Sequence, residues 1–208
     1  TGQHMQQYSV MIQEKKYYII HKPCNVLSQF TDKFGRKTIS DLFDFPKEVY
    51  PIGRLDYDSE GLLLLSDEKK MVDLILNPKF KHEKEYLVQV EGRITEKAAR
   101  DISEGVLIEG KKTLPAKVKI QESGFSYPER NPPIRERKSI PTSWIKVIIT
   151  EGRNRQVRKM TAAVGFPTLR LIRIRIANIE IKELKPGEVR ELSCAEISVL
   201  KELLNFKE

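Results

Sequence analysis

The residues best suited to chemistry lie in one short acidic turn. Residues 53–61 have the sequence GRLDYDSEG, in which two glycines bracket one arginine and three acids. Four consecutive leucines at 62–65 follow at once and predict a fully buried strand, which would hold the turn rigidly. Arg54, two residues before Asp56, is placed to keep that acid ionised. An ionised carboxylate on a rigid edge is suited to covalent catalysis as a nucleophile.

The same turn supports two other interpretations. Charged loops most often serve as solvated connections between secondary-structure elements. Alternatively, Asp56, Asp58 and Glu60 alternate along the chain and could converge on one hard cation. A single Asp-x-Asp pattern is a weak signal for a metal, and no histidine lies near it in the sequence. We therefore expect no metal site.

A basic helix is predicted in the last third of the chain. Residues 154–164 have Asn154 as the expected N-cap and Gly165 just beyond the expected end. The apolar stripe of this helix faces away from three basic side chains, which are Arg155, Arg158 and Lys159. This basic face is either solvated or a contact for a polyanion.

A basic strand is predicted directly after this helix. Residues 169–176 alternate apolar residues with arginine, which indicates a strand with one basic face. Its arginines are Arg170, Arg173 and Arg175. Together with Arg153 and the preceding helix, this face could form a positive groove for a phosphate backbone.

Prolines stiffen a basic loop between residues 131 and 141. Its basic side chains are Arg135, Arg137 and Lys138. A rigid surface connector and a preordered arm for RNA fit this pattern equally well.

Tyr86 lies on a predicted strand at 85–90 and has two interpretations. A tyrosine on a strand usually belongs to the core and hydrogen-bonds through its hydroxyl group. A tyrosine ring can also stack on an extruded nucleobase. The strand pattern alone does not decide between these roles.

The rest of the sequence supplies the elements that must position these residues. Apolar alternation and β-branched residues predict further strands at 17–21, 116–120, 144–150 and 189–192. Helices are predicted at 67–76, 95–103 and 195–204, a short helix at 38–43, and a partner of the first strand at 26–30. Strands and helices do not alternate regularly, so we expect an α+β fold with a mixed, mostly antiparallel sheet.

Composition sets further limits on the protein. The 208 residues carry a net charge of +8, and 39% are hydrophobic, which suffices for a substantial core. No apolar run approaches the ~20 residues of a membrane span, and no secretion signal opens the chain, so we expect a cytoplasmic protein. Cys24 and Cys194 lack metal-like spacing and are expected to be free thiols. Residues 1–15 are interpreted as a vector scar and an N-terminal arm, with Met5 as the native start.

Several motifs in a fixed order resemble the RNA pseudouridine synthases, and most closely the branch that acts on bacterial ribosomal RNA. The turn GRLDYDSEGLL at 53–63 is similar to the catalytic motif of that family. Lys22, Pro23 and Tyr86 also fall in the family's order. Further matching segments are PPIRERK at 132–138, EGRNRQVRKM at 151–160 and GFPTLRLIR at 165–173. The resemblance extends from about residue 17 to residue 192.

The resemblance implies a fold, a reaction and a partner. Residues 16–208 would form one catalytic domain of two lobes that share a sheet, with flanking helices and a central RNA-binding cleft. The reaction would be the isomerisation of a specific uridine in 23S ribosomal RNA, on a nucleotide flipped out of its stack. Such a reaction needs no cofactor, and we expect none, nor any partner besides the RNA, and a monomer. Many relatives carry an S4-type RNA-binding domain, and nothing before residue 17 is long enough for one.

Residue roles follow from the same resemblance. It implies that Asp56 is the nucleophile, that Arg158 pairs with it and that Tyr86 lies beneath the target base. Arg54 is similar to the residue that fills the gap left by the flipped nucleotide, and Leu171 to the apolar residue that packs against the tyrosine. The other residues expected to contact RNA are Arg135, Arg137, Lys138, Arg153, Arg155 and Arg173.

Two other classes of protein remain open at this point. One is a metal-dependent nuclease or phosphotransferase built on Asp56, Asp58 and Glu60, which a chelator would inactivate. The other is a non-catalytic protein of RNA binding or ribosome assembly, in which replacing Asp56 would change nothing measurable. The sequence also leaves open whether Asp56 attacks C1′, attacks C6 or removes a proton from C2′.

Overall fold

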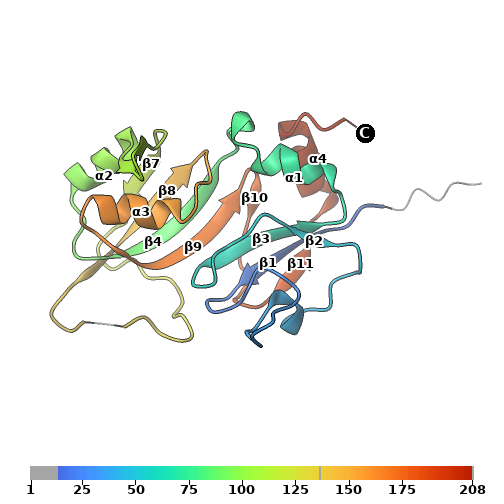
Figure 1. The fold of residues 1–208 in the computed structure, drawn as a ribbon, viewed down its shortest axis with the longest axis horizontal. Coiled ribbons are helices and arrows are strands. Elements are labelled where there is room, and N and C mark those ends of the chain that lie inside the picture. The colour runs from blue at the N-terminus through green and yellow to red at the C-terminus, as the bar shows by residue number, and fades with distance from the viewer. Residues whose placement is uncertain (1–13, 136, 208) are drawn as a thin grey trace, which may run out of the picture.

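The computed structural model describes residues 14–135 and 137–207 and has an α+β architecture (Figure 1). The helices are α1 (Lys70–Leu76), α2 (Glu96–Glu104), α3 (Gln156–Ala163) and α4 (Cys194–Leu203). The strands are β1 (Tyr17–Lys22), β2 (Tyr50–Ile52), β3 (Glu60–Ser66), β4 (Lys84–Glu91), β5 (Leu107–Ile108), β6 (Lys111–Lys112), β7 (Lys117–Ile120), β8 (Thr142–Ile149), β9 (Thr168–Ile176), β10 (Ile179–Glu180) and β11 (Val189–Glu191). The expected vector scar, including Met5, and most of the expected arm lie outside the described residues.

One large sheet organises the described part of the chain. Its strands follow the order β11-β1-β3-β9-β4-β8-β7, with β2 paired to β3 and β10 paired to β9. β3 and β9 run parallel, whereas the other pairs of this sheet are antiparallel. The expected mixed, mostly antiparallel sheet is confirmed. The parallel pair joins strands that are more than a hundred residues apart, and it brings the acidic turn before β3 beside β9.

The four leucines of β3 are buried because both faces of this strand are covered. Leu62 and Leu64 pack with residues of α1 and α4, while Leu63 and Leu65 pack into a second cluster beneath the loops before β2. A strand that is buried on both faces reads as a continuous apolar run rather than as an alternation. The sequence-based prediction of a buried strand at 62–65 is therefore confirmed.

The other half of the sheet has a separate core. Val88 of β4 packs with Ile102 of α2 and Met160 of α3, so these helices cover one face of β4, β8 and β9. On the opposite face an aromatic cluster forms around Trp144 of β8 and includes Tyr127. Figure 1 shows α1 and α4 beside one half of the sheet and α2 and α3 beside the other. The acidic turn lies where the two halves meet.

Local sequence signals predict most element ends correctly. The side chain of Thr95 caps α2, and Ser193 and Glu196 form the predicted capping box of α4. The expectation that residues 26–30 pair with β1 is wrong, because β3 and β11 occupy the two sides of that strand. The short helix expected at 38–43 is a single 3-10 turn at Ile39–Asp41. Among the described residues, no helix has the length and apolar character needed to cross a membrane.

Candidate functional site

Glycine at position 61 allows the acidic turn to lie against β9. Gly61 has a φ of +105°, and a Cβ atom there would lie 2.2 Å from the carbonyl oxygen of Arg173. No side chain fits between backbones that are so close, and L-residues disfavour this φ. The residue that follows the three acids must therefore be glycine for β3 and β9 to pair as they do.

The backbone of the turn is anchored on both sides of Asp56. The hydroxyl group of Ser28 donates to the carbonyl oxygen of Leu55 at 2.9 Å. The Tyr57 carbonyl oxygen accepts hydrogen bonds from the Asn25 amide at 2.8 Å and from the Lys22 ammonium at 3.4 Å. Because the backbone is held on both sides of Asp56, its carboxylate is presented from a rigid turn.

Lys22 belongs to the sequence motifs described above, but its role as an anchor of the turn was not predicted. Its side chain is fully buried, and its ammonium donates to the carbonyl oxygens of Pro23 at 2.8 Å and Val26 at 2.7 Å. Burial lowers the pKa of Lys22 to about 8. The signal available in the sequence was a lysine at the end of a strand of otherwise apolar character, directly before a proline.

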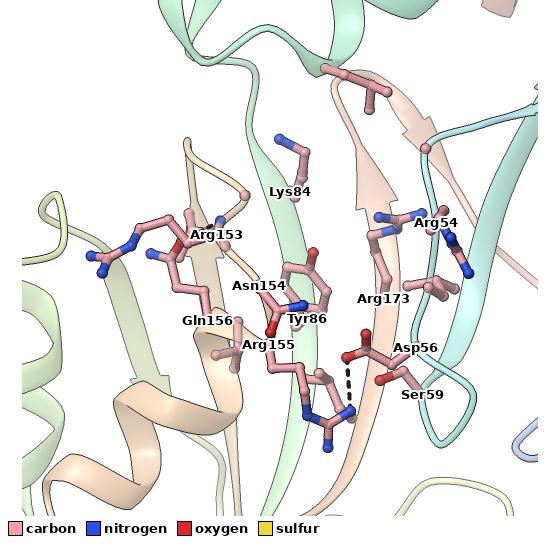
Figure 2. Close-up of a pocket in the computed structure, with 17 residues that line it drawn as sticks. Arg54, Asp56, Ser59, Lys84, Tyr86, Arg153, Asn154, Arg155, Gln156 and Arg173 are labelled. Carbon is pink, nitrogen blue, oxygen red and sulfur yellow. Dashed lines mark hydrogen bonds and ion pairs between the residues drawn. The ribbon is translucent and has the colours of Figure 1, made fainter. Parts of the chain in front are cut away.

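The side chain of Asp56 lines a pocket of about 330 Å³ between the two halves of the sheet. The pocket is also lined by Arg54, Tyr86, Leu171 and Arg173, so it brings together residues of the turn, β4 and β9. Figure 2 shows the Asp56 carboxylate and the ring of Tyr86 facing the same space. Further lining residues come from the segment before α3, and they are Arg153, Asn154 and Arg155.

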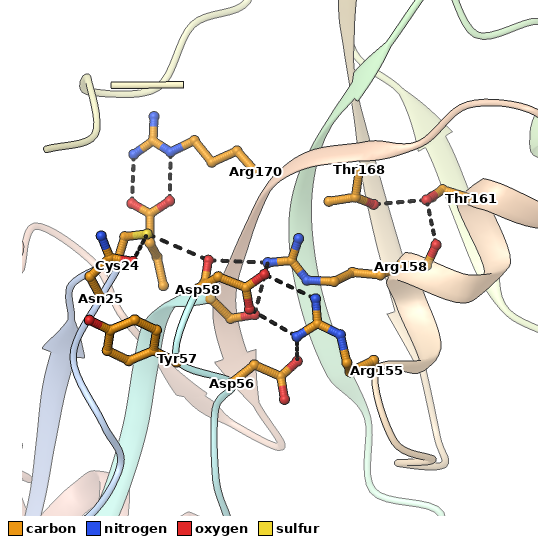
Figure 3. A network of polar contacts seen from close by, with 12 residues as sticks. Cys24, Asn25, Asp56, Tyr57, Asp58, Arg155, Arg158, Thr161, Thr168 and Arg170 are labelled. Carbon is orange, nitrogen blue, oxygen red and sulfur yellow. Dashed lines mark hydrogen bonds and ion pairs between the residues drawn. The ribbon is translucent and has the colours of Figure 1, made fainter. Parts of the chain in front are cut away.

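The arginine that contacts Asp56 is Arg155 rather than the expected Arg158. The Nη1 atom of Arg155 lies 3.2 Å from Oδ2 of Asp56, and its guanidinium also donates to both carboxylate oxygens of Asp58, at 2.9 and 3.0 Å (Figure 3). Arg158 instead donates to the carbonyl oxygen of Asp58 and to the hydroxyl group of Ser59, both at 3.1 Å. The expected pairing of Arg158 with Asp56 is thus corrected.

The start of α3 explains this difference. Arg155 rather than Asn154 occupies the N-cap position, and it has the left-handed backbone conformation with a φ of 49°. Its side chain is 41% exposed at the mouth of the pocket, where the carboxylates lie. Arg158 lies one turn further on, with its side chain only 13% exposed, and its Nη2 is held by Asp58 and Ser59.

The charges around the turn support one another. Hydrogen bonds from Arg155 hold the pKa of the Asp58 carboxyl below its usual range, and the same bonds raise the pKa of Arg155. Burial lowers the pKa of Arg158, while the charge of Asp58 opposes that effect. Asp58 therefore links both arginines to the turn that carries Asp56.

Tyr86 belongs to the core and to the pocket at the same time. Its residue surface is 8% exposed, and it packs in the same cluster as Val88 and Leu171. Both Tyr86 and Leu171 also line the pocket. The two interpretations of this tyrosine are therefore compatible: β4 and its neighbours fix the ring, and its free side faces the space next to Asp56.

The arginines of β9 do not form the continuous positive groove that their spacing suggested, because they are buried or paired. Arg170 is 3% exposed and forms two hydrogen bonds of 2.8 Å with the carboxylate of Glu60. Arg175 pairs with Glu83 and Glu85. Arg173 is 5% exposed and donates through Nε to the carbonyl oxygen of Leu62. The acids that pair with Arg170 and Arg175 come from distant segments, so the alternation in the sequence did not reveal them.

The same ion pairs bear on the alternative metal site. Glu60 is engaged by Arg170, and Asp58 is engaged by Arg155, so these carboxylates turn to different partners. Within residues 14–135 and 137–207, no group of three or more His, Cys, Asp or Glu side chains is placed to share a metal ion. The alternative arrangement, in which Asp56, Asp58 and Glu60 converge on one cation, is not observed among the described residues.

The basic loop lies apart from the pocket of Asp56. It contributes to a separate groove of about 240 Å³, whose basic residues are Arg135, Arg137 and Lys138. All three are exposed, and Arg137 lies 3.7 Å from a carboxylate oxygen of Glu91. Arg153 lines the Asp56 pocket but also donates to the carbonyl oxygens of Ile108 and Lys111, which fastens the β5–β6 hairpin to the segment before α3.

One pocket residue carries a charge that the sequence analysis overlooked. Lys84 lines the pocket at the start of β4, and it is 7% exposed. Its position two residues before Tyr86 places both side chains on the same face of the strand. That spacing was the signal in the sequence that could have identified it.

Comparison with known proteins agrees with this geometry. The sequence profile of the RNA pseudouridylate synthase family matches residues 16–163. The chain is 48% identical over 185 residues to ribosomal large subunit pseudouridine synthase E of Vibrio vulnificus, covering 89% of this chain and 78% of that protein. The same-named protein of Xanthomonas campestris is 45% identical over 83% of this chain and 92% of its own length.

A solved structure supports the same assignment. A crystal structure of a pseudouridylate synthase superposes with a TM-score of 0.75 at 31% identity, over 91% of this chain and 75% of that one. Similarity of sequence and of fold thus extends across most of the chain, including the acidic turn and Tyr86. The chain belongs to the RNA pseudouridylate synthase family.

Proposed function

We propose that this protein isomerises a specific uridine of 23S ribosomal RNA to pseudouridine, with Asp56 as the nucleophile on a flipped-out nucleotide. One observation carries the proposal. Among the residues that line the pocket, Asp56 is the one with an acidic side chain, and the ring of Tyr86 faces the same space. The names of the similar large-subunit synthases support ribosomal RNA as the substrate.

The reaction transfers uracil from an N–C bond to a C–C bond within one nucleotide. The bond between N1 and C1′ breaks, the base rotates, and a bond between C5 and C1′ forms while C5 releases its proton and N1 gains one. The product therefore has the same composition as the substrate, and no oxidant or reductant is needed. A base can enter the pocket only after leaving its stack, because Asp56 lies inside a concave site of the protein.

The pocket residues have distinct proposed roles. Tyr86 provides a fixed ring against which the base packs, and Leu171 supports that ring from β9. Arg155 orients the Asp56 carboxylate through the contact of 3.2 Å. Arg158 acts as a positioning residue, because it holds the turn through Asp58 and Ser59.

The RNA backbone is proposed to cross the mouth of the pocket. Arg54 is exposed at the rim of the pocket, where it can replace the flipped nucleotide in the stack. Arg153 and Arg155 flank the same opening, whereas Arg173 would meet only the nucleotide inside. The exposed basic loop supplies phosphate contacts further away, through Arg135, Arg137 and Lys138. We also propose that residues 16–208 act as one catalytic domain, as a cytoplasmic monomer.

The proposal is tested with separate transcripts of 16S and 23S ribosomal RNA that carry 5-tritiated uridine. We expect the purified protein to release tritium from 23S RNA alone, in an amount that corresponds to one site. Mapping of the pseudouridine by reverse transcription after carbodiimide treatment then gives the position. Release from neither RNA, despite binding, would favour a non-catalytic RNA-binding protein. Release from 16S RNA alone would contradict the proposed substrate.

A further inference from the structure

Two buried cations line the Asp56 pocket and have no carboxylate partner in the part of the chain that the structure describes. Lys84 is 7% exposed and Arg173 is 5% exposed, and both lie against the space that Tyr86 faces. Figure 2 shows Lys84 on the opposite side of Tyr86 from Asp56 and Arg155. The proposed roles of Asp56, Tyr86 and Arg155 leave neither side chain with a part in the reaction.

The hydrogen bonding of both cations is incomplete. Arg173 donates through Nε to Leu62, but its Nη2 atom is buried and has no acceptor among the described residues. In residues 14–135 and 137–207, the Lys84 ammonium makes no hydrogen bond or ion pair. Burial, and after it the charge of Arg173, lower the pKa of Lys84. Buried cations are normally paired, so two unpaired ones in a pocket call for an anionic ligand.

The neighbouring arginines of the same strand show that the lack of an acidic partner is particular to the pocket. Arg170 and Arg175, which flank Arg173 on β9, each have a glutamate partner. Arg173 differs from them in its place in the pocket beside Asp56. The strand therefore leaves a positive charge unneutralised where a substrate enters.

We infer that Lys84 and Arg173 form an anion subsite for the uracil base, which stabilises the negative charge that the base carries while it is detached from ribose. This inference rests on the proposed function. When the N1–C1′ bond breaks, the electron pair leaves with the base and spreads over N1, O2 and O4. The base uses that pair to form the bond from C5 to C1′ while the Asp56 carboxylate leaves C1′ with its own electron pair, after which C5 loses its proton and N1 gains one.

The depth of the subsite favours the base over a backbone phosphate. A phosphate of the target strand remains attached to its neighbours, so it stays near the mouth of the pocket, where Arg54 and Arg155 are exposed. The base is the part of a flipped nucleotide that reaches furthest inward. Fixed cations in a site that excludes water stabilise developing negative charge strongly and need no reorganisation during the reaction.

The test compares Lys84→Met with Lys84→Arg and with Lys119→Met, a control that removes an exposed lysine of β7. We expect Lys84→Met to lower the single-turnover rate on saturating RNA by about 100-fold, with RNA affinity within about twofold of wild type. Lys84→Arg should retain most of the rate. The wild-type rate should fall at alkaline pH as Lys84 loses its proton, and Lys84→Arg should move that fall to higher pH.

Three results of this kinetic comparison would overturn the inference. The first is a single-turnover rate of Lys84→Met equal to that of the Lys119→Met control. The second is a loss of RNA affinity in Lys84→Met with an unchanged rate, which would indicate a phosphate contact. The third is a rate of Lys84→Arg that falls at the same alkaline pH as that of wild type. A wild-type protein that forms no pseudouridine would contradict the proposed function instead. Calorimetric titration of the protein alone then tests the subsite: 5-nitrouracil, an acidic uracil analogue, should bind to wild type and not to Lys84→Met. Binding of inorganic phosphate alone, or of neither probe, would overturn the subsite.

Discussion

Glu60 and Arg170 form a buried ion pair that connects the acidic turn to the centre of the sheet. Glu60 is 2% exposed and Arg170 is 3% exposed, and two hydrogen bonds of 2.8 Å join them. The Arg170 guanidinium also lies 5.4 Å from the ring centre of Tyr127 and 5.9 Å from that of Trp144. Replacing Glu60 with Gln keeps the shape of the side chain but leaves the arginine without a counter-charge.

The expected cost is large because the remaining charge stays buried. Removal of one partner from a buried ion pair destabilises a protein by about 3 to 5 kcal/mol. The two rings already face the guanidinium and continue to stabilise it, by about 1 to 2 kcal/mol, so we expect the lower end of that range. A loss of about 3 kcal/mol is a considerable part of the ~5 to 15 kcal/mol that stabilises a typical domain.

Urea unfolding followed by circular dichroism measures this effect. With a slope of about 2 kcal/mol per molar urea, Glu60→Gln should lower the midpoint by about 1.5 M. The double variant Glu60→Leu with Arg170→Met should recover much of the loss, because neither charge then remains buried. A midpoint of Glu60→Gln within about 0.25 M of wild type, which corresponds to about 0.5 kcal/mol, would refute the reasoning.

Three further predictions follow from the site and its supports. Arg155→Ala should slow the single-turnover rate but change the free energy of unfolding by less than about 1 kcal/mol, because its ion pairs are exposed. Arg158→Ala should instead lower the free energy of unfolding in urea by about 1 to 3 kcal/mol. A wild-type rate for Arg155→Ala would contradict the role of its contact with Asp56. Replacing the three basic residues of the loop with alanine should reduce the slope of log affinity against log salt by about 0.7 to 0.9 per lost phosphate contact, and an unchanged slope would make the loop a connector. Hydrogen bonds from Arg190 lower the pKa of Glu196 to about 2. This acid therefore stabilises the fold fully above its unfolded pKa of about 4.5, and progressively less as the pH falls toward 2. The free energy of unfolding of Glu196→Gln should depend less on pH across that interval than that of wild type, and an equal dependence would refute this prediction.

Sequence signals that depend on neighbours along the chain predicted the structure well. The leucine run gave the central strand β3, and the capping residues Thr95 and Ser193 gave the starts of α2 and α4. These features are local because a cap or a buried run is set by residues a few positions apart. The turn at Asp56 and its place directly before a buried strand could be predicted for the same reason.

Features that depend on distant pairing could not be predicted in this way. The alternation in β9 gave a strand but not the burial of Arg170, because its partner Glu60 lies 110 residues earlier. Helical spacing placed Arg155 and Arg158 on one face, yet the left-handed conformation of Arg155 separates their contacts. Asparagine is a favoured N-cap because its side-chain oxygen can accept hydrogen bonds from the amides of the first turn, so residue type alone pointed to Asn154 as the cap.

The most direct test of the proposed function is the rate of tritium release by Asp56→Asn from ribosomal RNA that carries 5-tritiated uridine. Asparagine has nearly the same shape as aspartate but no negative charge, so the anchors of the turn through Ser28 and Lys22 should persist. We expect no detectable release above background, with RNA affinity and the unfolding midpoint close to those of wild type. Release by Asp56→Asn at a rate comparable to that of wild type would contradict the assignment of Asp56 as the nucleophile.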